Sequence, residues 1–143
     1  MIDNRTAPYA ALLLRVSLGI MFLAHGLLKV FVFTLPGTAQ FFEKVGFPGW
    51  AAYPVTALEI VGGLLLVAGV YSRVVAAALI PVLIGAAMVH VGNGWVFSAP
   101  NGGWEYPVFL VVIAAVVALL GDGAYALKPA ATRGTPVGNI KLA

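Results

Sequence analysis

The chain has no cysteine among its 143 residues. Disulfide bonds, thiol redox chemistry and thiolate metal sites are therefore excluded. Charged residues are also scarce: they make up 9% of the chain, whereas a soluble domain carries about a quarter. Because 62% of the residues are hydrophobic, polar side chains are too few to cover a surface in water. These deficits predict one compact all-α domain embedded in a membrane.

Motifs for phosphate, nucleotide or hydrolytic chemistry are missing as well. The sequence has no Walker loop, no glycine-rich dinucleotide motif and no His-Glu-x-x-His pair. The net charge of +3 is small, and most basic residues flank apolar runs. That pattern indicates orientation in a membrane and not a nucleic-acid interface. We expect no self-contained hydrolase or nucleotide enzyme, and no nucleic-acid partner.

Four apolar runs approach the length of about 20 residues that crosses a bilayer. They cover about residues 8–32, 50–70, 72–91 and 105–120. Pro8, Pro54 and Pro107 fall in first turns, where the missing N–H costs no hydrogen bond. The sequence therefore predicts a membrane-embedded four-helix bundle that occupies residues 1–127.

The basic residues predict how the bundle is oriented. Four spans place both termini on one side, together with Arg5, Arg73, Lys128, Arg133 and Lys141. The opposite side carries Lys29 and Lys44. The positive-inside rule then assigns the termini to the cytoplasm. Residues 128–143 lack hydrophobic periodicity and are predicted to be a flexible cytoplasmic tail.

The two connections on the outer side are long. Residues 34–49 combine phenylalanines with charged residues, which is typical of a short amphipathic or re-entrant segment at the interface. Residues 92–104 are rich in glycine and asparagine, which favour tight turns. Trp95 and Trp104 are natural anchors at the level of the lipid headgroups.

Ionisable residues inside the apolar runs indicate a site. They are Arg15, His25, Glu59, His90 and Glu105. A charge at the bilayer centre costs at least ~2.5–3.5 kcal/mol, so such residues usually face the bundle interior and find partners. With a rise of 1.5 Å per residue, Arg15 and Glu59 lie within about 8 Å of each other in depth. A structural ion pair between them is one hypothesis.

The remaining polar residues gather toward the outer side. His25, Lys29, His90, Asn93 and Glu105 all fall at outer helix ends. We therefore expect an outward-facing polar cavity with Arg15 as its floor and Glu59 above it. For three rim residues there are simpler interpretations. Lys29 would reach the headgroups, Asn93 would stabilise a turn, and Glu105 would match the dipole at a helix N-terminus.

Five stretches give the sequence a family resemblance. They are Leu14–Gly19, Phe22–Lys29, Leu58–Gly63, His90–Gly94 and Gly102–Pro107. In this order they resemble the DoxX family of small four-helix membrane proteins, over about residues 8–127. The resemblance implies a multi-pass bundle in the inner (plasma) membrane. It also implies an association with redox systems, as a subunit of quinone-linked oxidoreductases or a partner of oxidative-stress enzymes.

Residues and resemblance together predict a cavity for a small hydrophobic or quinone-like molecule, in a membrane component of a redox or oxidative-stress system. Glu59 and His90 are the candidate proton-handling, catalytic residues. The candidate ligand-binding residues are Arg15, His25, Lys29, Asn93 and Glu105. Because the chain has no electron carrier of its own, a redox role needs a bound cofactor such as a quinone, or a partner subunit.

Other functions remain open on the same residues. One alternative is a small-molecule transporter, and another is a non-enzymatic assembly or receptor subunit, since intramembrane charges also mark transport pathways. His25 and His90 also suit a bis-histidine haem, or a metal site completed by Glu105. The lipid bilayer is the predicted partner, with redox subunits or a second copy of the chain as further ones.

Overall fold

The computed structural model describes residues 3–128 of the chain. These residues form five α-helices and no β-strand: α1 Ala7–Phe31, α2 Leu35–Lys44, α3 Ala52–Ala68, α4 Ser72–His90 and α5 Glu105–Leu120. Two short 3-10 helices, η1 Gly49–Ala51 and η2 Val91–Asn93, adjoin α3 and α4. The all-α prediction is confirmed. Except for Lys128, the predicted tail 128–143 lies outside the described residues.

Three of the helical segments are long and apolar enough to cross a membrane: Ala7–Phe31, Gly49–Ala68 and Ser72–Asn93. The fourth apolar helix, α5, has 16 residues and is therefore about 24 Å long. All four runs predicted from the sequence are helical, with bounds within two residues of the expected ones. The additional helix α2 lies where the sequence predicts a short amphipathic or re-entrant segment.

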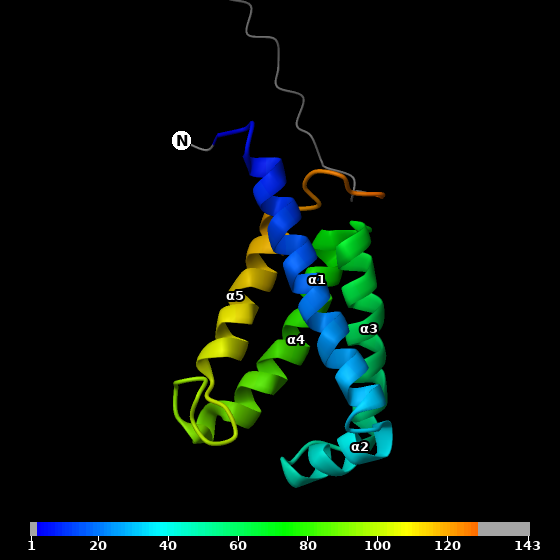
Figure 1. Ribbon diagram of the computed structural model, residues 1–143, viewed down its shortest axis with the longest axis vertical. Helices are drawn as coiled ribbons and strands as arrows, with labels where there is room; N and C mark the ends of the chain where they lie inside the picture. The colour runs from blue at the N-terminus through cyan, green and yellow to red at the C-terminus, as the bar shows by residue number, and fades with distance from the viewer. Residues whose placement is uncertain (1–2, 129–143) are drawn as a thin grey trace, which may run out of the picture.

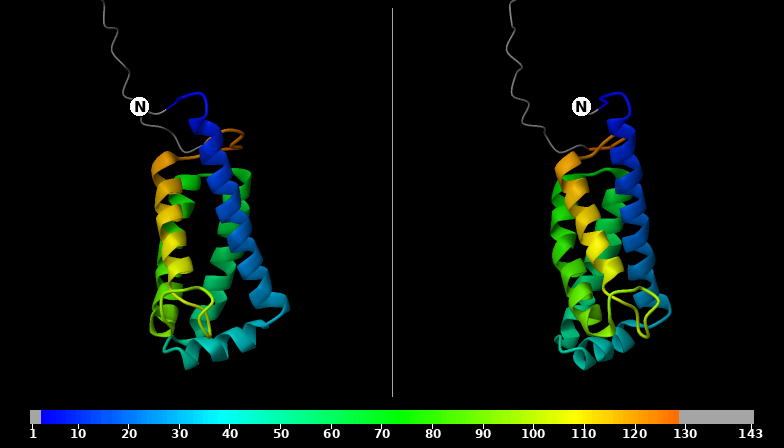
Figure 2. Two further views of the ribbon diagram at one scale, coloured as in Figure 1. Left: turned by 60° about the vertical axis from the view of Figure 1, so that its left-hand side comes forward. Right: turned by 90° about the vertical axis from the view of Figure 1, so that its left-hand side faces the viewer.

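The four apolar helices associate as two pairs. Helix α1 packs along α3, and α4 packs along α5. The pairs lie close together at one end of the molecule and diverge toward the other, where α2 crosses below them (Figures 1 and 2). We call the first end the capped end; it comprises residues 69–73 and 121–128. The other is the hollow end, formed by α2 and residues 91–104.

Glycine lets α1 and α3 approach closely. A Cβ atom added at Gly19 would lie 2.8 Å from the carbonyl oxygen of Gly63, and a Cβ at Gly63 would lie 2.8 Å from that of Gly19. The two backbones are therefore in direct contact there. Gly26 faces Ile60 and Glu59 in the same way, one to two turns nearer the hollow end. This stripe fixes the register between the two helices.

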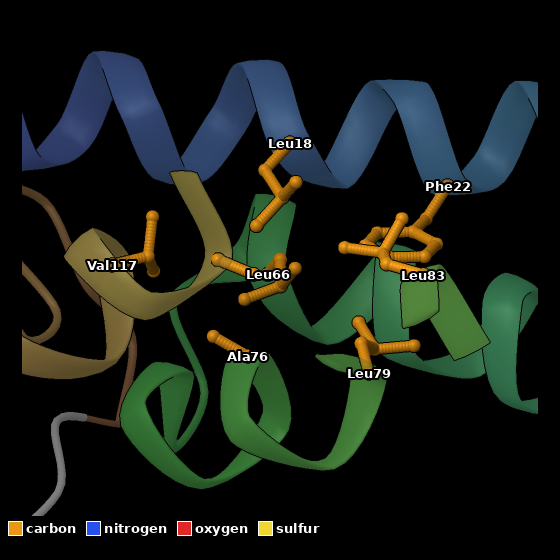
Figure 3. Close-up of a cluster of buried hydrophobic side chains, with 8 residues drawn as sticks. Leu18, Phe22, Leu66, Ala76, Leu79, Leu83 and Val117 are labelled. Carbon is orange, nitrogen blue, oxygen red and sulfur yellow. The ribbon is translucent and has the colours of Figure 1, made fainter. Parts of the chain in front are cut away.

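The hydrophobic core lies where the two pairs meet, toward the capped end. Side chains from α1, α3, α4 and α5 point into it (Figure 3). Its buried members are Leu18, Phe22, Leu66, Ala76, Leu79, Leu83, Ala114 and Val117. Because the pairs diverge beyond Phe22 and Leu83, the core does not continue into the hollow end.

Candidate functional site

A cavity of about 600 Å³ occupies the hollow end between the two helix pairs. Its volume falls in the range of pockets that hold drug-sized ligands. The lining is mostly apolar and comes from every α-helix and from the loop before α5. The aromatic part is Phe22, Phe41, Phe42, Phe47, Phe97 and Tyr106. Its basic and acidic side chains are His25, Lys29, Glu59 and His90.

Lys29 and Glu59 form an ion pair in the cavity wall made by α1 and α3. Nζ of Lys29 lies 2.9 Å from Oε1 and 2.8 Å from Oε2 of Glu59. Only the contact with Oε1 has hydrogen-bond geometry, so Oε2 accepts no hydrogen bond from the described residues. Glu59 is 5% exposed. Gly26, one turn before Lys29, brings α1 close enough to α3 for the two side chains to meet.

Side-chain direction explains this pairing. Side chains in an α-helix lean toward the helix N-terminus. Because α1 and α3 run antiparallel, Lys29 leans into the bundle and Glu59 leans toward the hollow end, so they approach each other. Arg15, like Lys29, leans toward the start of α1. Because Arg15 is already nearer that end than Glu59 is, its side chain points away from Glu59. The sequence prediction compared backbone depths only and therefore paired Glu59 with the wrong residue.

Arg15 lies at the capped end and does not line the cavity. It is 1% exposed. Its guanidinium donates to the carbonyl oxygens of Leu66 at 2.7 Å, Val67 at 2.9 Å and Ala124 at 3.1 Å. Arg15 therefore stabilises the C-terminus of α3, where the last carbonyls lack partners within the helix. The structure does not place it as the floor of the cavity or in contact with Glu59.

The two histidines present the same ring nitrogen for ligand binding. Nδ1 of His25 lies 2.9 Å from the carbonyl oxygen of Met21, and Nδ1 of His90 lies 2.7 Å from that of Ala86. A carbonyl only accepts, so Nδ1 carries the proton in both rings. In the neutral ring, Nε2 then holds the lone pair and accepts a hydrogen bond or a proton. Both rings line the cavity.

Asn93 and Glu105 hold the loop that forms one wall. Nδ2 of Asn93 donates to the carbonyl oxygens of Asn101 at 3.2 Å and Gly102 at 2.9 Å. Oε1 of Glu105 accepts from the backbone N–H of Phe97 at 2.8 Å. Neither Asn93 nor Glu105 lines the cavity, whereas Phe97 and Gly102 do. The two polar residues thus act on the cavity through residues 94–104.

Gly102 also packs against His90. Its φ is +79°, and an added Cβ would lie 3.2 Å from Cδ2 and 3.4 Å from Nε2 of His90. A glycine is therefore favoured by the backbone conformation and by the nearby ring. The position of this loop fixes how much room the Nε2 edge of His90 has.

Comparison with known proteins agrees with this architecture. The DoxX family model matches residues 10–92. A curated protein of Bacillus subtilis (strain 168), named "Putative oxidoreductase CatD", is 35% identical over 138 residues, which cover 96% of this chain and 98% of that one. The chain belongs to the DoxX family. It is accordingly a membrane protein. No solved structure matches the chain significantly.

The extent of the match divides the cavity of this DoxX-family protein. The residues matched by the family model end at Gly92 and include His25, Lys29, Glu59 and His90. The wall formed by residues 94–104 and α5 lies beyond them. The charged pair and the two histidines therefore lie within the residues that the family model matches, whereas the alignment with the Bacillus subtilis relative covers 96% of the chain.

A metal site is not supported by the geometry. Within residues 3–128, no group of three or more His, Asp or Glu side chains is arranged to hold a metal ion. Glu105 is engaged with the Phe97 N–H and does not join His25 and His90. The sequence missed a different contribution, namely that of α2, whose Phe41 and Phe42 line the cavity. The cluster of phenylalanines in residues 34–49 was the available signal.

Proposed function

We propose that the cavity binds a quinone-like molecule and that the protein is a membrane component of a redox system. One observation carries this proposal: an apolar cavity ends in a buried Lys29–Glu59 ion pair and two histidines with accepting Nε2 atoms. A quinone has an apolar ring with oxygens on its edge, which suits such a cavity. The oxidoreductase name of the Bacillus subtilis relative agrees with this assignment.

The residues of the chain supply positioning and proton exchange. The Lys29 ammonium has donors beyond those used by Glu59 and suits a ring carbonyl oxygen. Nε2 of His90 or His25 accepts the hydrogen of a ring hydroxyl. Glu59, whose Oε2 lies 2.8 Å from the Lys29 ammonium and accepts no hydrogen bond from the described residues, takes or returns a proton there. Bound quinone would supply the two-electron chemistry, and the electrons come from a partner subunit.

We further propose four membrane spans with the capped end in the cytoplasm of a plasma-membrane protein. Lys29 is neutralised by Glu59, so among the described lysines and arginines the hollow end keeps only Lys44, next to Glu43. The capped end carries Arg5, Arg73 and Lys128. This asymmetry supports the positive-inside assignment. Asn4→Cys and Gly46→Cys should react with an impermeant maleimide from the cytoplasmic and outer sides, respectively.

Ligand analysis and titration test the proposed activity. Small molecules extracted from purified protein in nanodiscs should include a quinone by mass spectrometry. A 2,3-dimethoxy-5-methyl-6-decyl-benzoquinone should bind saturably. His90→Phe should weaken its affinity about tenfold, since a hydrogen bond to a buried ligand contributes about 1.5 kcal/mol. Tyr125→Phe, at an exposed position of the capped end, is the control and should bind normally.

Absence of saturable quinone binding would overturn the redox proposal. In that case the transporter alternative gains support, because a charged pair inside the membrane also suits a transport pathway. Uptake of small molecules into proteoliposomes separates that alternative from an assembly or receptor subunit.

A further inference from the structure

We infer that the cavity opens sideways into the bilayer, between α1 and α5, and takes a ring-headed ligand with a long alkyl or prenyl tail. The ring lies at Lys29, Glu59 and His90, and the tail extends through the opening into the lipid. This inference rests on the proposed function and specifies its ligand class.

Residues that both line a cavity and are exposed mark where it reaches the surface. The exposed lining residues are His25 on α1, Phe41 on α2, Pro81 on α4, Phe97 in the loop before α5, and Tyr106 on α5, which is 46% exposed. Phe41 and Phe97 lie at the hollow end, whereas His25 and Tyr106 lie on helices of different pairs. Met21 and Leu110, one turn deeper on the same helices, also line the cavity and are half-buried. The opening is therefore bordered by one helix from each pair.

The depth of these residues sets what the opening faces. His25 lies six residues before the end of α1, which is about 9 Å below that end. Leu110 lies five residues after the start of α5, about 8 Å along it. The hydrocarbon core is about 30 Å thick, so both positions lie within it. Tyr106 is only one residue after the start of α5, so the inferred opening runs from the interface into the lipid tails.

The other routes into the cavity are crossed by protein. Helix α2 and residues 94–104 extend across the hollow end, and both contribute lining side chains (Figure 2). On the α3–α4 face, Phe47 reaches Gly85, where an added Cβ would lie 3.9 Å from its ring. Pro81 is exposed on that face and marks the competing opening. We place the opening between α1 and α5, and the exposed Phe41, Phe97 and Pro81 mark the alternatives that the labelling experiment below distinguishes.

The arrangement of polar groups fits a tailed ligand. Lys29 and His90 lie near the helix ends at the hollow end, whereas Met21 and Leu110 lie deeper and are apolar. An amphiphile with a polar ring can therefore bind without leaving the membrane, because its tail exchanges lipid for apolar side chains at little cost.

Photolabelling tests the route directly. The probe is the dimethoxy-methyl-benzoquinone ring with a ten-carbon chain that ends in a diazirine, in phosphatidylcholine nanodiscs. We expect adducts on α1 between Met21 and Leu28 and on α5 between Tyr106 and Ile113. An excess of the tail-free ring should reduce them at least fivefold, because it occupies the site of the ring.

A matched pair of variants gives an independent measurement. Leu110→Trp adds bulk at the opening and should weaken binding of the decyl-tailed quinone about tenfold. The tail-free ring should bind within twofold of the unchanged protein, because it fits inside the cavity. Leu119→Trp, which is on the same helix, 77% exposed and near the capped end, should affect neither ligand.

The outcomes separate the two proposals. Adducts on α2, on residues 94–104 or around Pro81, with competition by the tail-free ring intact, would overturn the opening between α1 and α5 and leave the quinone site standing. Equal weakening of both ligands by Leu110→Trp also contradicts a tail in the opening. Labelling that the ring does not reduce would remove the quinone site and this inference together.

Discussion

The capped and hollow ends both contain charges inside apolar surroundings, but they satisfy these charges differently. At the capped end, cationic side chains bind backbone carbonyls; at the hollow end, a cation binds a carboxylate beside a cavity. Arg15 donates to the C-terminal carbonyls of α3, and Arg73 donates to those of α5. Arg15 and Arg73 thus bind backbone carbonyls at the C-terminus of a neighbouring helix, since carbonyls there lack partners and carry partial negative charge. Lys29 binds the carboxylate of Glu59 instead.

At the capped end, the same combination of a glycine and an arginine is found at the C-terminus of both α3 and α5. Gly69 follows α3 with φ +71°, and Gly121 follows α5 with φ +90°. A Cβ at Gly69 would lie 2.5 Å from a guanidinium nitrogen of Arg15, and one at Gly121 would lie 2.7 Å from Nε of Arg73. Each glycine thus permits both the turn and the approach of an arginine. The carboxylate of Asp122 adds a bond from the Ser72 N–H at 2.8 Å.

The largest expected effect comes from removing the buried arginine at the capped end. Arg15→Ala removes the donor to the carbonyls of Val67 and Ala124 and one of the two donors to Leu66, which keeps the Gly69 N–H. We expect the free energy of unfolding to fall by about 3 kcal/mol, because unsatisfied buried groups cost about 1–3 kcal/mol each. Thermal unfolding in detergent measures it. Quinone affinity of the folded fraction should stay within twofold.

Two further variants calibrate that result. Arg73→Ala removes a half-buried arginine of the same kind and should cost about 1 kcal/mol. Arg15→Lys keeps the charge but not the planar fork and should be intermediate. If Arg15→Ala instead keeps the free energy of unfolding of the unchanged protein but loses quinone binding, Arg15 is not a purely structural residue of the capped end. It would then be the cavity floor that its depth predicts.

The helices could be predicted from the sequence, whereas the partners of the buried side chains could not. The bounds of α4 and α5 follow from apolar runs that begin beside Ser72 and Glu105, because hydrophobic length alone marks such helices. Predicting the Lys29–Glu59 pair also requires the direction in which side chains lean on antiparallel helices. Depth counting places Cα atoms only, so it brought Arg15 and Glu59 together although their side chains point apart.

The wall of the cavity could not be predicted for another reason. Residues 94–104 follow a path set by positive φ at Gly94, Asn101 and Gly102. Composition indicates turns in such a segment but not their order in space. The sequence therefore left Asn93 open between a turn and a ligand contact, and Glu105 between a helix dipole and a ligand contact, whereas the structure shows both bonded to the loop.

A smaller effect is expected at the ion pair of the hollow end. Glu59→Gln leaves the Lys29 ammonium without its anion, so stability should fall by about 2 kcal/mol and quinone affinity about tenfold. The double variant Lys29→Met with Glu59→Gln should recover most of the stability but not the affinity. A double-mutant cycle, run once with unfolding and once with quinone titration, measures both coupling energies.

The cycle distinguishes a functional pair from a structural one. Coupling in stability alone, with normal quinone affinity in the double variant, would make Lys29–Glu59 a packing feature like the arginine contacts at the capped end. The charges at the two ends would then differ in their binding partners, but both would serve only to stabilise the fold.

The smallest expected effect is at the loop. Asn93→Ala removes two hydrogen bonds to residues 101 and 102, so stability should fall by about 1 kcal/mol. Quinone affinity should fall three- to fivefold, because Gly102 no longer holds the Nε2 edge of His90 in place. In spectra of ¹⁵N-labelled histidine, the Nε2 signal of His90 should shift, while that of His25 stays.

Glu105 provides the matched pair for this prediction. Glu105→Gln keeps an oxygen that accepts from the Phe97 N–H and should behave like the unchanged protein. Glu105→Ala loses that bond and should resemble Asn93→Ala, since both residues act through the same loop. A loss of affinity beyond tenfold in Asn93→Ala, with the His90 signal unmoved, would instead place Asn93 in contact with the ligand. The ligand site would then extend past residues 94–104 as far as Asn93.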